Sequence, residues 1–112
     1  LEFRRVLFRS FDIIAGAANN VLAKSSVHGP ALAEKGILYA PDYVINAGGL
    51  ANVYGEIHDW DAERSKKKAG EIYQTLLRIY ALSESEGIGT HTAADRVAEE
   101  RIARARHLQR TW

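Results

Sequence analysis

Two short segments that contain asparagine are the parts of this sequence best suited to bind a small polar ligand. Ala18-Asn19-Asn20 and Asn46-Ala47-Gly48-Gly49 each follow a run of apolar residues. An asparagine side chain presents a carbonyl acceptor and an amide donor together, which is the complement of another carboxamide. Asparagine is also a common turn residue. Because the pattern recurs after two successive apolar runs, a ligand site and a purely structural role both stay open.

The other residues that could take part in a reaction give weaker signals. The chain has no cysteine, and its histidines lack the i, i+4 spacing of a helical metal site, so no metal site is predicted. Asp42 follows a proline and could act as an acid or base, although a turn aspartate is the commoner case. The sequence contains no glycine-rich phosphate loop and no nucleophile elbow. These patterns identify no catalytic residue, and the role of Asp42 stays open.

The asparagines are expected to follow the strands of a strand, helix, strand unit. Residues 11–16 are apolar and β-branched, which favours a buried parallel strand. Gly29-Pro30 predicts the start of a short helix over residues 31–35, and Gly36 suits a left-handed helix end. A second strand is expected over residues 37–40. This βαβ pattern places both asparagine segments at the carboxyl edge of one parallel sheet, where open α/β sheets bind ligands.

Three helices are expected after the second strand. The first has one apolar face, formed by Leu50, Val53 and Ile57 at helical spacing. A longer helix is expected from Asp61 to the glycines at 87 and 89. The last helix is expected to begin at a segment similar to a capping box, residues 92–95, with an apolar stripe formed by Ala98, Ile102, Ala105 and Leu108. Its arginines alternate with acidic residues, which favours a solvated, ion-paired face over a nucleic-acid site.

Length and composition limit the chain to one small domain or part of one. The 112 residues are 46% hydrophobic and 26% charged, as in ordinary soluble proteins. Beyond residue 10, 12 Lys and Arg face 13 Asp and Glu, so no electrostatic attraction to nucleic acid or an anionic membrane is expected. No apolar run approaches the roughly 18 residues of a membrane span, and no secretory signal is recognisable. We expect a cytoplasmic protein, consistent with the absence of cysteine.

Residues 1–10 differ abruptly in composition from the rest of the chain. They contain three arginines against a single glutamate. Residues 7–10, Leu-Phe-Arg-Ser, can be back-translated as CTC TTC CGA TCT, which looks like the end of a sequencing adapter. We interpret residues 1–10 as a non-native leader that does not pack on the body, with a native basic helix as the alternative. On this interpretation the protein continues upstream of Phe11.

Three segments, taken together, resemble a known enzyme family. Residues 14–20 are Ile-Ala-Gly-Ala-Ala-Asn-Asn, residues 34–49 are Glu-Lys-Gly-Ile-Leu-Tyr-Ala-Pro-Asp-Tyr-Val-Ile-Asn-Ala-Gly-Gly, and residues 93–102 are Ala-Ala-Asp-Arg-Val-Ala-Glu-Glu-Arg-Ile. They resemble the carboxy-terminal third of a leucine dehydrogenase, in the glutamate/leucine/phenylalanine/valine dehydrogenase superfamily. The resemblance extends from Phe11 almost to the end of the chain, and its middle block is long and specific.

The resemblance implies NAD-linked oxidative deamination of a branched-chain L-amino acid, such as leucine, to its 2-oxo acid with release of ammonia. Asn19, Asn20 and Asn46 match family positions near the nicotinamide and its ribose. Leu50 and Val53 match positions that line the pocket for the substrate side chain. Family members commonly carry valine where this chain has Leu50, which leaves the preferred side-chain length open. The family's catalytic lysine and aspartate, and its pyrophosphate loop, belong to regions that this chain does not contain.

The implied fold class is α/β, with the last parallel strands of a partial Rossmann-type domain and their crossover helix, followed by carboxy-terminal α-helices. Residues 11–112 would then be the carboxy-terminal part of the NAD-binding domain of an amino-acid dehydrogenase, inactive alone, from a parent that forms a homo-oligomer. Phenylalanine, valine and glutamate dehydrogenases are alternatives within the superfamily. A half-domain that binds nucleotide without catalysis is a further alternative.

Overall fold

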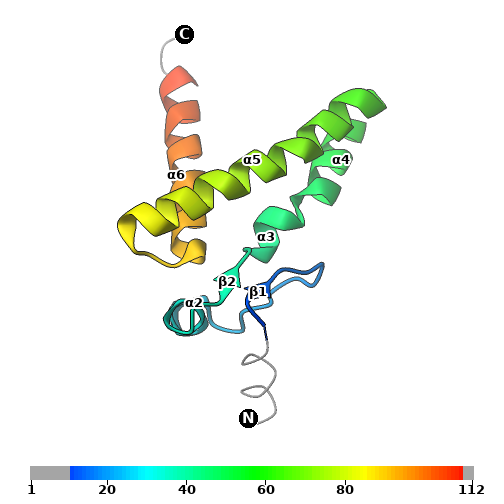
Figure 1. Cartoon of the computed structure of the whole chain (residues 1–112). Helices are drawn as coiled ribbons and strands as arrows, with labels where there is room; N and C mark the ends of the chain where they lie inside the picture. The colour runs from blue at the N-terminus through cyan, green and yellow to red at the C-terminus, as the bar shows by residue number, and fades with distance from the viewer. Residues whose placement is uncertain (1–10, 110–112) are drawn as a thin grey trace.

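The computed structural model describes residues 11–109 (Figure 1). The leader at residues 1–10, and its expected lack of packing, lie outside the described residues. Two short strands and a helix form one end of an elongated molecule of 53 × 30 × 21 Å, and the longer helices diverge from it. In chain order the elements are β1 (Ile13–Ile14), α2 (Ser25–Glu34), β2 (Leu38–Tyr39), α3 (Asp42–Ile45), α4 (Ala47–Ile57), α5 (Ala62–Glu86) and α6 (Thr90–Gln109). No helix among residues 11–109 is long and apolar enough to cross a membrane.

The two strands pair in parallel, which confirms the strand, helix, strand unit expected from the sequence. Ile13 lies opposite Leu38 and Ile14 opposite Tyr39. The Leu38 and Ala40 amides donate 2.9 Å hydrogen bonds to the carbonyls of Asp12 and Ile14. Both strands are shorter than the expected ranges 11–16 and 37–40, and in the described chain each has a partner on one edge only. The parallel pairing still brings the carboxyl ends of both strands to one edge.

Helix α2 begins earlier than the sequence predicts. The expected start at Gly29-Pro30 is wrong, because the helix already begins at Ser25 and includes Pro30. Proline costs the helix one hydrogen bond, but Gly29 and Leu32 are buried and hold this stretch against the rest of the molecule. A Cβ atom at Gly29 would lie 2.2 Å from the imidazole of His91, so α2 approaches the start of α6 closely. The expected left-handed Gly36 is confirmed, with φ +67°.

The long helices follow their predicted positions, with one correction. The Asp61 carboxylate accepts a 2.7 Å hydrogen bond from the Arg64 amide and caps α5, which ends at left-handed Gly87. Helix α6 begins at Thr90, so a capping box at 92–95 is wrong. Asp95 instead accepts a 3.0 Å hydrogen bond from the Tyr43 hydroxyl, because this stretch already lies inside the helix and faces α3.

The buried residues form two small clusters. Leu32, Ile37 and Tyr39 pack between α2 and β2. The second cluster joins α5 to α6 and consists of Ile79, Ala93, Ala94 and Val97. The apolar stripe predicted for α6 is exposed, because α6 diverges from α5 beyond Val97, and its first members, Ala98 and Ile102, line the open cavity between the two helices (Figure 1). Within α6, Arg104 pairs with Glu100, as the alternating charges indicated. Two further ion pairs join α5 to α6, Arg78 with Glu100 and Glu86 with Arg96.

Candidate functional site

The carboxyl edge of the sheet brings the two predicted asparagine segments together. Asn46 lies between α3 and α4, and its Nδ2 donates hydrogen bonds to the carbonyls of Gly16 and Ala18, at 3.3 and 3.4 Å. These carbonyls belong to the loop that follows β1. The contact spans about thirty residues of sequence and joins the chain after β1 to the chain after β2. A crevice at this edge is the usual ligand position in open α/β sheets.

A buried carboxylate also binds the backbone of the loop after β1. Asp42 is only 7% exposed. Its Oδ2 accepts a 2.7 Å hydrogen bond from the Asn20 amide, and its Oδ1 accepts a 2.5 Å hydrogen bond from the Tyr39 hydroxyl. The Asp42 amide in turn donates to the Tyr39 hydroxyl at 3.3 Å. This aspartate therefore connects β2 to the loop after β1 through charge-assisted hydrogen bonds.

The ionisation of this pair follows from its surroundings. Burial alone would raise the pKa of Asp42, but the hydrogen bonds from Tyr39 and Asn20 favour the carboxylate and keep its pKa below the ordinary 3.8. Burial and the hydrogen bond to Asp42 raise the pKa of Tyr39 to about 12. At neutral pH the carboxylate is thus the acceptor and the phenol the donor. Asp42 is held by its neighbours, so a structural role is better supported than that of an acid or base exchanging protons with solvent.

The three predicted ligand-binding asparagines have different surroundings. Asn20 adopts a left-handed backbone, with φ +55°, and both Asn19 and Asn20 are exposed. Within residues 11–109 their side chains make no hydrogen bond, and Asn46 uses only its amide nitrogen. The three side chains therefore have acceptor and donor groups available at one edge. Such a set suits a ligand with a carboxamide and hydroxyl groups.

The two predicted substrate-pocket residues lie on the exposed face of α4. Leu50 is 75% exposed and Val53 52% exposed. They are one helical turn apart, as their spacing indicated, and Ile57 continues the same apolar face. Within the described chain this face has no protein partner. The residues can line one wall of a pocket, and other walls would have to come from elsewhere.

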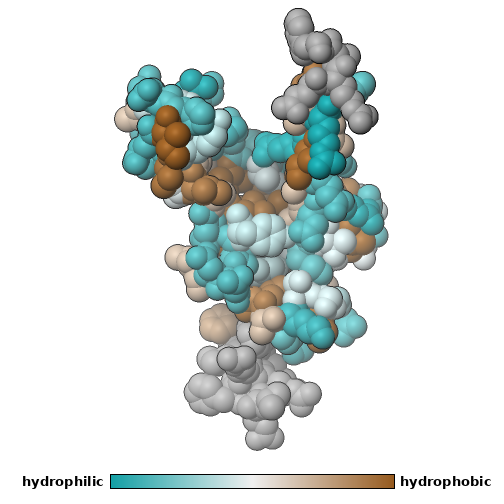
Figure 2. Space-filling view, turned by 180° about the vertical axis from the view of Figure 1, so that it is seen from behind, coloured by the Kyte–Doolittle hydropathy of each residue, from teal (hydrophilic) through white to brown (hydrophobic). Residues whose placement is uncertain are grey.

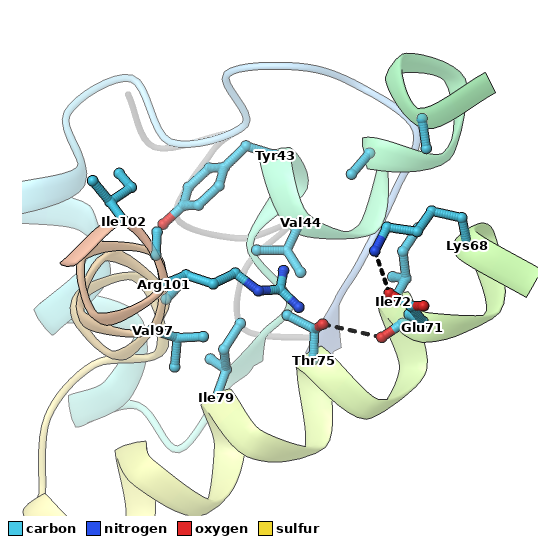
Figure 3. A pocket seen from close by; sticks show the side chains of 14 residues that line it. Tyr43, Val44, Lys68, Glu71, Ile72, Thr75, Ile79, Val97, Arg101 and Ile102 are labelled. Carbon is cyan, nitrogen blue, oxygen red and sulfur yellow. Dashed lines mark hydrogen bonds and ion pairs between the residues drawn. The ribbon is translucent and has the colours of Figure 1, made fainter. Parts of the chain in front are cut away.

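The cavity that the described chain does form lies between the long helices, and the sequence did not reveal it (Figure 3). It measures about 400 Å³ and is lined mainly by apolar residues of α3 to α6. Arg101 points into it from α6, while Lys68 and Glu71 form a 2.6 Å ion pair at its rim. Figure 2 shows apolar surface in the hollow between the diverging helices. The predicted pocket residues face elsewhere and do not line it.

Sequence reasoning missed two tyrosines of the site region. Tyr39 was assigned only to a strand, and Tyr43 was given no role, yet both donate hydrogen bonds to aspartates. Burial and the contact with Asp95 raise the pKa of Tyr43 well above its ordinary value. The i, i+3 spacing of Tyr39 and Asp42 was a detectable signal, since a strand that turns into a helix can bring such residues into contact. The described residues contain no group of three or more potential metal ligands.

Comparison with known proteins places the chain in one family. The family model described as glutamate/leucine/phenylalanine/valine dehydrogenase matches residues 4–110. A leucine dehydrogenase from Bacillus cereus is 48% identical over 89% of this chain and 27% of its own length. A valine dehydrogenase from Streptomyces albus is 52% identical over 84% of this chain and 26% of its own length.

A solved structure agrees with these relatives. The crystal structure of L-tryptophan dehydrogenase from Nostoc punctiforme matches with a TM-score of 0.82 and 51% identity, over 86% of this chain and 29% of that chain. The present chain thus spans less than a third of the length of the relatives that it matches. The shared sequence, the parallel strand pair and the order of helices make this chain a member of the glutamate/leucine/phenylalanine/valine dehydrogenase family.

Proposed function

We propose that this chain supplies the carboxy-terminal part of the NAD-binding domain of a cytoplasmic, homo-oligomeric dehydrogenase that deaminates a branched-chain L-amino acid such as leucine. The observation that carries the proposal is the identity of about half of the residues to leucine and valine dehydrogenases over most of this chain. The hydrogen bonds that join the segments after β1 and β2 at the carboxyl edge of the sheet support the proposal, because such an edge is where this class of fold binds nucleotides.

The asparagines are the proposed cofactor ligands. NAD, when bound, would accept the hydride released from the substrate. Asn19 and Asn20 offer their exposed carboxamides from the loop after β1, and Asn46 offers its oxygen from the start of α4. Together these groups can bind and orient a carboxamide and neighbouring hydroxyl groups, which fixes the reacting face of the ligand.

Leu50 and Val53 are the proposed wall of the substrate pocket. Two aliphatic side chains one turn apart favour an aliphatic substrate through burial of apolar surface. Helix α4 carries no lysine or arginine, so its sequence offers no partner for the second carboxylate of glutamate. Leucine and valine are therefore favoured over glutamate. Phenylalanine and tryptophan stay as alternatives, because relatives of similar identity include a tryptophan dehydrogenase.

A chimeric enzyme tests the proposal. Residues 11–112 would replace the matching segment of the Bacillus cereus leucine dehydrogenase, with which they share 48% identity. We expect leucine-dependent reduction of NAD by the chimera. The 112-residue chain alone should give none, because it lacks a pyrophosphate loop and a catalytic lysine, and orientation of both reactants accounts for roughly 7–11 kcal/mol of a barrier.

Several outcomes would count against the proposal. Turnover by the isolated chain would show that no segment needed for activity lies outside it, contrary to our proposal. A folded chimera that binds NAD but oxidises none of leucine, valine, phenylalanine, tryptophan or glutamate would favour the non-catalytic alternative. The host enzyme without the segment is the control, since it should be inactive.

Substitution of Leu50 tests the substrate wall. Leu50→Ala in the chimera should enlarge the pocket and shift the ratio of kcat/KM values toward bulkier amino acids, on the order of 10-fold to 200-fold for a methylene-sized difference. Ile57→Ala is the matched control, because Ile57 lies on the same face of α4, about two turns farther along. Unchanged kcat/KM ratios for valine, leucine and phenylalanine would show that Leu50 does not line the pocket.

A further inference from the structure

The Asn19-Asn20 turn in the loop after β1 carries two of the proposed cofactor ligands, and Val21 and Leu22, which follow it, are partly buried against the cluster of Leu32, Ile37 and Tyr39. Residues 15–20 are all exposed. Ordering each residue of a loop costs about 1–2 kcal/mol in backbone entropy, and between the packed Ile14 and Val21 these six residues bury no side chain of their own that would offset that cost. Hydrogen bonds made to the backbone of residues 15–20 therefore contribute to the conformation of the turn.

Those hydrogen bonds come from the segment that follows β2. Asn46 binds the carbonyls of Gly16 and Ala18, and Asp42 binds the amide of Asn20. The Asp42 contact is the shortest of these, at 2.7 Å, and it involves a charged acceptor that is shielded from water. It also acts at the residue with a left-handed backbone, φ +55°, which asparagine adopts less readily than glycine.

Tyr39 fixes the direction of this carboxylate. Its hydroxyl occupies Oδ1, which leaves Oδ2 directed at Asn20. Tyr39 is itself buried with Leu32 and Ile37, so its ring cannot turn away without disturbing that cluster. The apolar cluster under α2 is thereby connected, through two hydrogen bonds, to the exposed Asn19-Asn20 turn.

We propose that Asp42 is a positioning residue that sets the Asn19-Asn20 turn for cofactor binding, with Tyr39 orienting its carboxylate. The proposal rests on the proposed function, because it assigns a task to the same edge of the sheet. Asp42 acts through the backbone of Asn20 and touches neither reacting group. Loss of such a positioning residue should weaken cofactor binding, and it should change the rate of the reaction little once the cofactor is bound.

The variants Asp42→Asn and Tyr39→Phe test this in the chimera. Asparagine keeps the size of the side chain but offers one acceptor oxygen in place of two, and phenylalanine removes only the hydroxyl. We expect Asp42→Asn to raise the KM for NAD by about tenfold, the scale of one lost hydrogen bond to a charged group. Tyr39→Phe should raise it by about threefold. The KM for leucine and the kcat should change less than about twofold in both.

Asp61→Asn is the matched control. Asp61 also accepts a 2.7 Å hydrogen bond from a backbone amide, but it caps α5 far along the chain from the asparagine turn. A merely structural loss lowers the amount of folded enzyme, and hence the apparent kcat, while both KM values stay the same. Asp61→Asn should show at most a small effect of that kind, because asparagine is about as good an N-cap as aspartate, and it should leave both KM values unchanged.

The outcomes separate the two proposals. If the unsubstituted chimera does not oxidise leucine, the proposed function fails and the positioning role fails with it. If the chimera is active and Asp42→Asn leaves the KM for NAD unchanged, only the positioning role is overturned. In the 112-residue chain, the Asn20 amide proton should also exchange with solvent faster after Asp42→Asn, at least tenfold by the same scale. Unchanged exchange would likewise overturn the role.

Discussion

The two ends of this molecule are stabilised in different ways. The helical end is joined by the apolar cluster of α5 and α6, with ion pairs only on its surface. The strand end has its own small cluster, against which Val21 and Leu22 of the loop after β1 pack. Residues 15–20 of that loop, which carry the proposed cofactor ligands, are exposed, donate a hydrogen bond to Asp42 and accept hydrogen bonds from Asn46. Apolar packing is indifferent to pH, whereas a loop held by a carboxylate is not. The comparison shows that the proposed binding groups belong to the part with the least packing of its own.

The strongest test of this contrast removes packing at the helical end. Ile79 is 1% exposed and lies at the centre of the α5–α6 cluster. Ile79→Ala should lower the free energy of unfolding of the 112-residue chain by about 2–5 kcal/mol, because it leaves a cavity that small neighbours cannot fill. Urea denaturation followed by circular dichroism measures the change. A loss below about 0.5 kcal/mol, as at an ordinary surface position, would show that this cluster does not hold the helices together.

The junction between the two ends should be the next most sensitive place. Gly29→Ala places a methyl group 2.2 Å from the His91 ring and should cost about 1–3 kcal/mol of unfolding free energy through overpacking. Gly70→Ala is the matched control, since no atom lies within 4 Å of the added carbon, and there alanine should stabilise α5 by up to about 1 kcal/mol. The double variant Gly29→Ala/His91→Ala should recover part of the loss. Equal effects of the two glycine substitutions would exclude close packing at this junction.

The strand end should respond to pH through Asp42. Its pKa is lower in the folded chain than the ordinary 3.8, so the carboxylate stabilises the fold above that value and loses the contribution as the pH falls through the lower, folded-state pKa. At neutral pH, Asp42→Asn should cost about 1 kcal/mol of unfolding free energy. The difference between wild type and variant should shrink below about pH 4. Urea titrations across this range measure it, and a difference that does not vary with pH would contradict the assignment.

The surface ion pairs should matter least. The side chains of Arg96 and Glu86 are 47% and 41% exposed, and the pair links α6 to the end of α5. Exposed pairs of this kind contribute about 0–1 kcal/mol, so Arg96→Ala should change the unfolding free energy by less than about 1 kcal/mol and less still in high salt. Thermal unfolding with and without added salt checks this. A larger loss than that of Gly29→Ala would reverse the expected order of the two contributions.

Local patterns in the sequence were enough to predict the elements that depend on neighbouring residues. The parallel strand pair, the left-handed Gly36, the helix that begins after Asp61 and ends at Gly87, and the apolar face of α4 all follow from residue type and spacing. The two asparagine segments were also recognisable, because they follow strands whose carboxyl ends must meet at one edge. The start of α2 and the capping of α6 were predicted wrongly, since in both places tertiary contacts outweigh the local preference of proline or of a capping residue.

The groups that fix the site become apparent only when distant segments are packed together. No pattern of spacing shows that Asp42 binds the backbone of Asn20, because the two residues are 22 positions apart and meet only when the strands pair. Nor does the helical repeat show how far along α6 its apolar side is covered. Ala93, Ala94 and Val97 are buried against α5, whereas Ala98 and Ile102 farther along line the open cavity between the two helices. Contacts between distant segments depend on how the elements pack, and packing energy is a property of the assembled elements and not of any single one.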